Sequence, residues 1–137
     1  MSVKNWLAGL WEKAKRARRD SESTDGMRAE TLAANYLRAQ GLVIVARNFR
    51  VRGGEIDLIA REGEITVFVE VRLRRSQAFG GAIGSIGLQK RRRLLLAAQH
   101  WLLRHPRQGN CRFDCVLLDD LDAHNLEWIR HAFTADA

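Results

Sequence analysis

Residues 53–75 read GGEIDLIAREGEITVFVEVRLRR and decide the fold, because they hold two strand-like runs around a short turn. Apolar residues dominate positions 55–61 and 65–72, and the glycines beside these runs are typical of turns. Two acids, Asp57 and Glu70, interrupt the apolar runs. An unpaired carboxylate is costly to bury, so each acid needs a partner that offsets this cost.

Strand parity places the two acids on the same side of the predicted hairpin. Side chains alternate between the faces of a strand, so a two-residue turn keeps Asp57 and Glu70 on one face. A turn formed by residues 62 and 63 makes Glu70 the diagonal neighbour of Asp57, and a turn one residue later sets them directly opposite each other. Either register brings their Cβ atoms within roughly 5 to 8 Å, whereas a three-residue loop separates them.

A pair of adjacent carboxylates is a typical site for a divalent cation. The two negative charges repel each other and raise one pKa unless a cation lies between them. Mg²⁺ binds through one or two carboxylates and takes further ligands from water and substrate phosphate. Asp57 and Glu70 therefore indicate metal-assisted phosphodiester hydrolysis, in which the ion lowers the pKa of a bound water. Glu30, on a predicted helix before the strands, completes the site if that helix packs at the strand ends.

Ordinary salt bridges are the alternative explanation of the two acids. Arg72 lies two residues beyond Glu70 on the same strand face and has the charge to neutralise it. Asp57 has Arg50 and Arg61 as candidate partners at the rim of the hairpin. Spacing alone favours these salt bridges over a metal site and leaves both interpretations open.

The remaining sequence predicts a single α/β domain between two terminal segments. The chain of 137 residues, 46% of them hydrophobic, suits one compact core. We expect a basic amphipathic extension with a linker at 1–25, the domain at 26–133 and a tail at 134–137. The composition of residues 21–26, SESTDG, predicts the linker. The extension carries apolar residues at helical spacing, which favours loose docking on the domain over a membrane-surface helix.

The domain is predicted to contain α, β, β, β, α and β elements in this order, which gives a mixed sheet flanked by helices. A helix at 27–40 ends before Gly41, and a long helix at 88–105 is stopped by Pro106. A glycine-rich loop at 79–87 is expected to cover the site. Strands are expected at 42–49, 55–61, 65–72 and 111–118. An element of undetermined type is expected at 126–133.

Basic residues are segregated along the chain. The net charge is +7, and residues 71–113 hold ten Lys or Arg residues without one acid, whereas residues 114–127 hold five acids and no Lys or Arg. Ten cations exceed what solubility needs, so we expect a polyanionic partner, of which nucleic acid is the leading example. Phosphate contacts hold a nucleic acid without reading its sequence. The residues expected to make them are Arg72, Arg74, Arg75, Lys90, Arg91, Arg92 and Arg93.

Other polar residues of the second half are expected to have structural roles. The two cysteines lie four residues apart in one predicted strand, where a disulfide between them is geometrically unfavourable, so we expect free thiols. Asp114 is expected to pair with Arg112 or with an arginine of another strand. No zinc-binding spacing matches the candidate ligands His100, His105, Cys111 and Cys115.

The sequence has no feature that indicates membrane insertion or export. No stretch approaches the roughly 18 to 20 apolar residues of a membrane span, and the N-terminus does not resemble a secretory signal. We therefore expect a cytoplasmic protein. The sequence leaves open whether the chain forms a homodimer.

The sequence resembles the YraN family, uncharacterised protein family 0102. The resemblance rests on GGEIDLIAREGEITVFVEVRLRR, on G-x-x-x-E at residues 26–30, on the FGG of the glycine-rich loop and on the later RFD, and it covers residues 26–133. That family is similar to the restriction-endonuclease-like, or PD-(D/E)XK, nuclease superfamily, which includes archaeal Holliday-junction resolvases. The resemblance implies a restriction-endonuclease-like αβββαβ core and metal-dependent endonuclease activity on structured or branched DNA.

The resemblance also implies roles for individual residues. Sites of the superfamily contain an Asp, then Glu-x-Lys, and a Glu on a preceding helix. Asp57 and Glu70 match the first two acids and are expected to bind Mg²⁺ or Mn²⁺. Glu30 matches the helical acid, and the backbone carbonyl of Val71 is expected near the metal.

Arg72 departs from the superfamily pattern, because nucleases usually have Lys at this position. A guanidinium does not give up a proton near neutral pH, so Arg72 is expected to hold phosphate or stabilise charge rather than act as a base. Lys90 is a candidate replacement amine, although a solvated helix position is the simpler interpretation. The departure keeps two other functions open: a non-catalytic nucleic-acid-binding module of the same fold, and a basic interaction protein that docks an acidic partner or a membrane surface.

Overall fold

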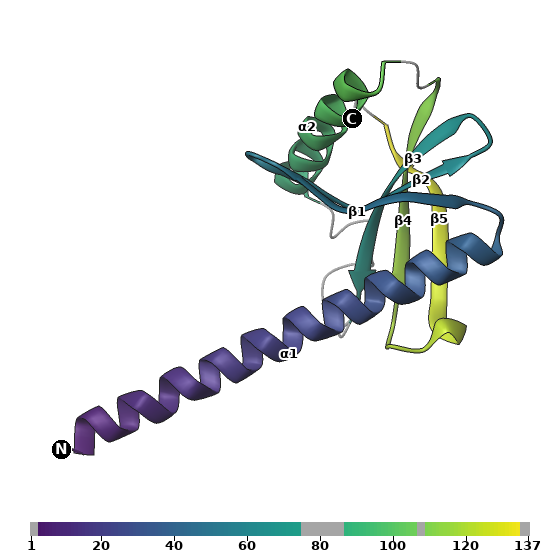
Figure 1. The fold of residues 1–137 in the computed structure, drawn as a ribbon. Helices are drawn as coiled ribbons and strands as arrows, with labels where there is room; N and C mark the ends of the chain where they lie inside the picture. The colour runs from purple at the N-terminus through teal and green to yellow at the C-terminus, as the bar shows by residue number, and fades with distance from the viewer. Residues whose placement is uncertain (1–2, 75–86, 107–108, 135–137) are drawn as a thin grey trace.

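The computed structural model describes residues 3–74, 87–106 and 109–134; within its first helix, side chains are described for residues 7–16 and 24–39. The mixed α/β order confirms the expected fold class (Figure 1). The expected core strands and the helix at 88–105 differ from the observed elements by at most two residues at either end. The elements are α1 (Val3–Ala39), β1 (Val43–Val51), β2 (Gly54–Glu62), β3 (Ile65–Leu73), α2 (Leu88–Arg104), β4 (Cys111–Leu118), the 3-10 turn η1 (Ala123–Asn125) and β5 (Leu126–Phe133).

The five strands form one sheet in the order β1-β2-β3-β4-β5. Neighbouring strands run antiparallel except β3 and β4, which are parallel. A parallel pair needs a crossover connection, and α2 lies in this connection. The element of undetermined type at 126–133 is β5, which pairs with β4 and adds an edge strand to the sheet.

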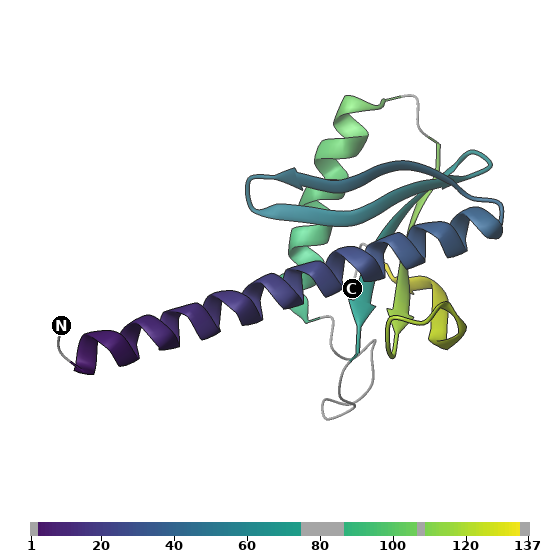
Figure 2. The ribbon, with the colours of Figure 1, turned by 60° about the horizontal axis from the view of Figure 1, so that its bottom comes forward.

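The two helices pack against separate apolar clusters, one on each face of the sheet (Figure 2). In the first cluster the C-terminal half of α1 buries Ala33 and Leu37 with Val69 of β3. In the second cluster α2 buries Leu94 with Phe68 of β3. Successive residues of β3 therefore face different helices, which explains why its apolar run is continuous rather than alternating.

A close approach between α2 and β2 occurs at Gly54. A Cβ atom at this position would lie 2.5 Å from the carbonyl oxygen of Arg93 and 3.0 Å from the backbone nitrogen of Ala97. Only glycine fits there without a shift of the helix. This contact holds the first turns of α2 against the β1-β2 hairpin and so fixes where the basic start of the helix lies.

The N-terminal region differs from the sequence-based expectation. α1 runs without interruption from Val3 to Ala39, so residues 21–26 continue the helix instead of forming a linker. The segment has no proline, and its one interior glycine, Gly26, costs only about 1 kcal/mol relative to alanine. Its composition is typical of loops, but it lacks a residue that ends a helix.

The N-terminal half of α1 projects away from the domain instead of docking on it (Figure 1). Among its described side chains, Leu7, Leu10 and Trp11 are 53%, 45% and 60% exposed. Ala29 is the first buried apolar residue in the described part of α1. Within the described residues, no helix is long and apolar enough to cross a membrane.

Candidate functional site

The β2-β3 hairpin brings Asp57 and Glu70 to adjacent positions. The strand ends leave Gly63 and Glu64 as the two turn residues, and Gly63 has a φ of 60°, as the first position of a type II′ turn requires. Continued by one residue beyond its last pair, this register sets Asp57 directly opposite Glu70. The later of the two turn positions that the sequence allowed is therefore the observed one.

Asp57 occupies the point where β2 separates from β3. The pairing of these strands begins at Leu58 and Val69, whereas β2 continues back to Gly54 alongside β1. Beyond this point the backbone N–H of Val71 donates to Oδ2 of Asp57 at 2.9 Å. The hydrogen bond fixes the Asp57 carboxylate beside β3, next to the residue that follows Glu70.

Glu70 is a buried acid with an amine beside it. Its side chain is 3% exposed, and its Oε1 lies 3.1 Å from Nζ of Lys90. The pKa of Glu70 is raised to about 8. Burial is the largest cause, and the charge of Asp57 and a side-chain hydrogen bond with Asp57 raise the pKa further, whereas Lys90 lowers it. Glu70 therefore retains its proton at neutral pH unless a cation replaces it.

Lys90 reaches the carboxylates from the start of α2. Besides its contact with Glu70, its Nζ lies 3.9 Å from Oε1 of Glu55. Its side chain is 28% exposed, so the amine is partly withdrawn from water. Lys90 therefore does not occupy the fully solvated position of the simpler interpretation, and its amine lies beside Glu70 and Glu55.

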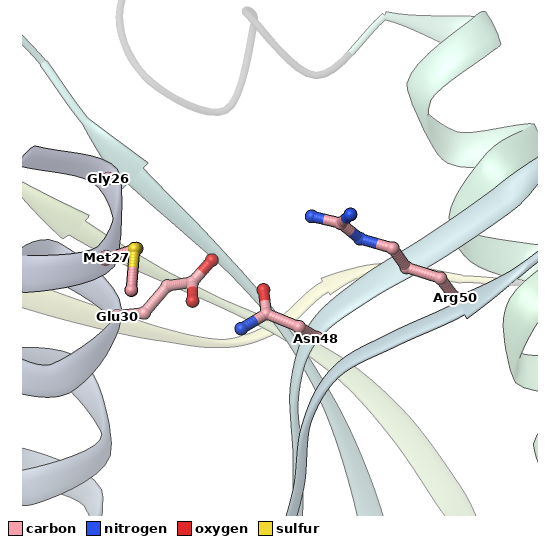
Figure 3. A pocket seen from close by; sticks show the side chains of 5 residues that line it. All are labelled: Gly26, Met27, Glu30, Asn48 and Arg50. Carbon is pink, nitrogen blue, oxygen red and sulfur yellow. The ribbon is translucent and has the colours of Figure 1, made fainter. Parts of the chain in front are cut away.

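Glu30 approaches Asp57 from α1 and lines an open pocket of about 420 Å³ with Met27, Asn48 and Arg50. Figure 3 shows the Glu30 carboxylate and the Asn48 amide pointing toward each other from α1 and β1. Burial and the charge of Asp57 raise the pKa of Glu30, and a hydrogen bond with Asn48 lowers it. Oε2 of Glu30 is buried without a hydrogen-bond partner, and such an oxygen suits a cation ligand.

The three acids are neighbours without forming one compact cluster. Among the described residues, no group of three or more Asp, Glu, His or Cys side chains is close enough to hold a metal ion. Asp57 interacts electrostatically with both Glu70 and Glu30, so it links the hairpin to α1. Two carboxylates are sufficient for Mg²⁺, which keeps several waters and uses substrate phosphate. The residues present therefore fit this ion.

Arg72 lies near the carboxylates on β3. The charges of Glu70 and Arg72 both act on Cys115, which is the register partner of Glu70 in β4. Burial first, and then the charge of Glu70, raise the pKa of Cys115 to about 12, and Arg72 lowers it. Cys115 is therefore a neutral buried thiol, and both it and Cys111 are free, as expected.

The first turns of α2 form the exposed part of the expected phosphate-binding surface. Arg92 and Arg93 are exposed, and no acid occurs in the first turn. Cations near a helix N-terminus oppose the helix dipole and cost roughly 0.3 to 1 kcal/mol each. A bound anion would offset this cost.

Other residues of the expected surface have partners within the protein or lie outside the described residues. Nη2 of Arg74 lies 2.8 Å from Oδ1 of Asp119, so this arginine is engaged at the end of β4. The guanidinium of Arg91 lies 5.6 Å from the ring centroid of Phe133. Arg75 and most of the glycine-rich loop lie outside the described residues.

Asp114 pairs with Arg112, as expected. Nε of Arg112 donates to both carboxylate oxygens of Asp114, at 3.0 and 3.1 Å. Nη1 of the same arginine donates to Glu62 of β2 at 2.9 Å. These contacts cross-link strands of the sheet, which indicates a structural role for Asp114.

The raised pKa of Glu70 predicts that the metal-free protein loses stability as the pH rises. Folded Glu70 keeps its proton up to about pH 8, whereas the unfolded chain releases it near the ordinary value of 4.5. Between these values the folded state binds more protons, so the free energy of unfolding falls with pH, by up to about 1.4 kcal/mol per pH unit. Urea unfolding in the presence of EDTA, between about pH 5 and pH 8, measures this fall.

Glu70→Gln supplies the comparison for this measurement, because glutamine does not ionise. We expect the variant to show a flatter pH dependence and to be more stable than the wild type at about pH 8. Glu64→Gln alters an exposed acid of the same hairpin and should keep the wild-type pH dependence. Identical pH profiles for wild type and Glu70→Gln would show that Glu70 ionises normally.

Comparison with known proteins gives matches that include these residues. The model of the Uncharacterised protein family UPF0102 matches residues 29–118, a range that contains Glu30, Asp57, Glu70 and Lys90. A UPF0102 protein of Dechloromonas aromatica is 56% identical over 117 residues, which cover 85% of this chain and 94% of the relative. A UPF0102 protein of Methylobacillus flagellatus is 53% identical over 107 residues, which cover 78% of this chain and 94% of the relative.

Proposed function

The chain belongs to the uncharacterised protein family UPF0102, and we propose that it binds nucleic acid and hydrolyses phosphodiester bonds in structured or branched DNA with Mg²⁺ or Mn²⁺. One observation carries the proposal: the buried carboxylate of Glu70, paired with Asp57, contacts the amine of Lys90 at 3.1 Å. Acids at opposed positions of a hairpin destabilise a sheet, so a protein needs a reason to keep them. The fold is compatible with the nuclease superfamily that the sequence resembles.

Two carboxylates of this chain would hold the metal. Asp57 and Glu70 supply the paired carboxylates, and the hydrogen bond from Val71 keeps Asp57 in place. The resemblance assigns Glu30 and the carbonyl of Val71 to the same site, where the unpartnered Oε2 of Glu30 would accept a hydrogen bond from a water of the ion. When bound, the ion lowers the pKa of a water and neutralises charge that develops on the phosphate. A cation would also displace the proton that Glu70 retains, because ligation needs the ionised carboxylate.

Lys90 would supply the amine that β3 lacks. A guanidinium does not act as a base near neutral pH, so the role open to Arg72 is to hold phosphate or stabilise charge. Lys90 lies at Glu70 and carries exchangeable protons, so we assign it the task of orienting the attacking water or stabilising charge on the phosphate. The glutamate and the lysine, which nucleases of the superfamily carry on one strand, would then lie on β3 and on α2.

The exposed start of α2 would hold the DNA backbone. Arg92 and Arg93 are exposed in the turn that begins at Lys90 and add positive charge to this end of the helix. Contacts of this kind bind phosphates of any sequence and weaken steeply with salt. The preference for structured or branched DNA comes from the resemblance and has to be measured.

Replacing Lys90 by Met is expected to lower the cleavage rate at saturating protein about a hundredfold and to leave DNA affinity nearly unchanged. Methionine keeps an unbranched apolar side chain and removes the charge beside Glu70. The expected loss is about a hundredfold because a positioned proton-transfer group contributes about 10² to 10⁴ to the rate. Lys90 lowers the pKa of Glu70, so its loss should also move the pH-rate profile to higher pH. Single-turnover rates and binding isotherms, both measured across pH, give these values.

Arg92→Met is the matched control for Lys90→Met, because it removes a cation from an exposed position of the same helix turn. We expect weaker DNA binding with a smaller salt dependence and an unchanged rate at saturating protein. A Lys90→Met protein that binds weakly but cleaves at the wild-type saturated rate would show that Lys90 contacts phosphate only.

A substrate panel tests the proposed function as a whole. Purified protein is incubated with Mg²⁺ or Mn²⁺ and four-way junctions, flaps and linear duplexes, and we expect cleavage that EDTA abolishes. Binding without cleavage would favour the second candidate, a non-catalytic nucleic-acid-binding module. Two observations point toward it: Arg72 replaces the usual lysine, and the described residues contain no three-ligand cluster. Absence of binding to every DNA would overturn both candidates.

A further inference from the structure

The N-terminal half of α1 presents an apolar face that the described structure does not cover. Leu7, Leu10, Trp11 and Ala14 recur at i, i+3, i+4 and i+7, the positions that lie on one side of a helix. The first three are about half exposed or more, although they are large apolar side chains. Neighbouring apolar side chains of this kind mark a contact surface more often than a solvated one.

Most of the net charge of the protein lies in the sequence segment that contains this apolar face. Residues 1–19 hold six of the 23 Lys and Arg residues and one of the 16 acids, so they carry +5 of the net charge of +7. Among the described side chains, Nζ of Lys15 lies 5.3 Å from the ring centroid of Trp11 and 3.6 Å from Oε1 of Glu12. A helix with an aromatic and apolar face beside lysines is typical of helices that lie in the headgroup region of a bilayer.

We propose that this half of α1 lies on the surface of an anionic lipid bilayer, with Leu7, Leu10 and Trp11 in the interface. The apolar face needs an apolar phase, which the phosphates of DNA do not provide. A second copy of the chain would provide apolar contacts, but it would bring two segments of charge +5 together. An anionic bilayer matches the face and the charge at once.

The lipid-binding face is well separated from the carboxylate site. Trp11 and Glu30 are 19 residues apart in the same continuous helix, which corresponds to about 28 Å along its axis. Contact between the N-terminal half of α1 and lipid therefore leaves the site uncovered. The inference is independent of the proposed nuclease function, because it involves other residues and another ligand.

Flotation of the full chain with vesicles tests the proposal. We expect binding to vesicles of phosphatidylcholine with phosphatidylglycerol, little binding to phosphatidylcholine alone, and weaker binding in high salt. Leu10→Glu and Trp11→Glu should each lower the partition coefficient about tenfold or more, because each removes apolar contact and adds negative charge. Leu103→Glu alters a leucine of α2 that is 79% exposed and should bind vesicles like the wild type.

The results of these measurements distinguish three partners for the apolar face: a lipid bilayer, a second copy of the chain and nucleic acid. Leu10 and Trp11 are exposed, so both variants should fold normally, which circular dichroism checks. Wild-type vesicle binding by both variants, or equal binding to neutral and anionic vesicles, would overturn the proposal. A dimer in light scattering that Leu10→Glu dissociates would assign the face to a second copy. Loss of DNA binding without loss of vesicle binding would assign it to nucleic acid.

Discussion

Glu70→Gln and Asp57→Asn are each expected to lower metal-dependent DNA cleavage by about a thousandfold or more. Each exchange nearly keeps the shape of the side chain and removes the charge that would hold a divalent cation. The stabilisation of developing charge by a metal is worth several kcal/mol, and about 1.4 kcal/mol changes a rate tenfold. Single-turnover cleavage at saturating protein, with Mg²⁺ and then Mn²⁺ titrated, measures the effect.

Two further readouts separate loss of chemistry from loss of the folded protein. DNA affinity in EDTA should equal or exceed that of the wild type, because neither variant adds negative charge and Asp57→Asn removes a carboxylate that would face phosphate. Glu64→Gln, in the turn of the same hairpin, alters an exposed acid and should cleave normally. Full activity in both Glu70→Gln and Asp57→Asn would mean that this hairpin is not the active site and that the cleavage has another origin.

The elements of the hairpin could be predicted because local pattern determines them. Apolar runs and flanking glycines set the strands, and strand parity set the shared face of Asp57 and Glu70. The register could not be predicted, because a turn at residues 62 and 63 and a turn one residue later fit the sequence equally well. The pairing of Glu62 with Ile65 shows that the later turn forms, and continuation of this register sets the acids opposite each other.

The contact between Lys90 and Glu70 depends on tertiary packing, which local pattern does not report. Lys90 reaches the acid because α2 packs closely on β2 at Gly54. In the sequence Lys90 is the first of four consecutive cations and looks like a solvated helix residue. Asn48 was missed for the same reason: its φ of 52° and its hydrogen bond with Glu30 arise where β1 meets α1.

A buried network around Asp114 links β4 to its neighbours in the sheet. Asp114 is fully buried and accepts two hydrogen bonds from Nε of Arg112. It also accepts one from Nε1 of Trp128 at 3.0 Å and one from the backbone N–H of His131 at 3.1 Å. The last two donors belong to β5, and the β4-β5 register is irregular at this point. The Asp114 carboxylate therefore accepts the backbone hydrogen bond of His131, which a carbonyl of β4 would accept in a regular ladder.

Asp114→Ala is expected to lower the free energy of unfolding by about 3 to 5 kcal/mol, because it removes the buried carboxylate beside Arg112 and leaves Glu62 as the remaining acid on that guanidinium. It also leaves the donors of Trp128 and His131 without their acceptor. This loss is a large part of the roughly 5 to 15 kcal/mol that stabilises a typical domain, so denaturant midpoints should fall clearly. Asp119→Ala breaks a more exposed ion pair with Arg74 and should cost less than about 1 kcal/mol. Asp114→Leu combined with Arg112→Met should recover part of the loss, since it removes both buried charges. Equal losses in Asp114→Ala and Asp119→Ala would show that the buried network stabilises the sheet no more than a surface ion pair does.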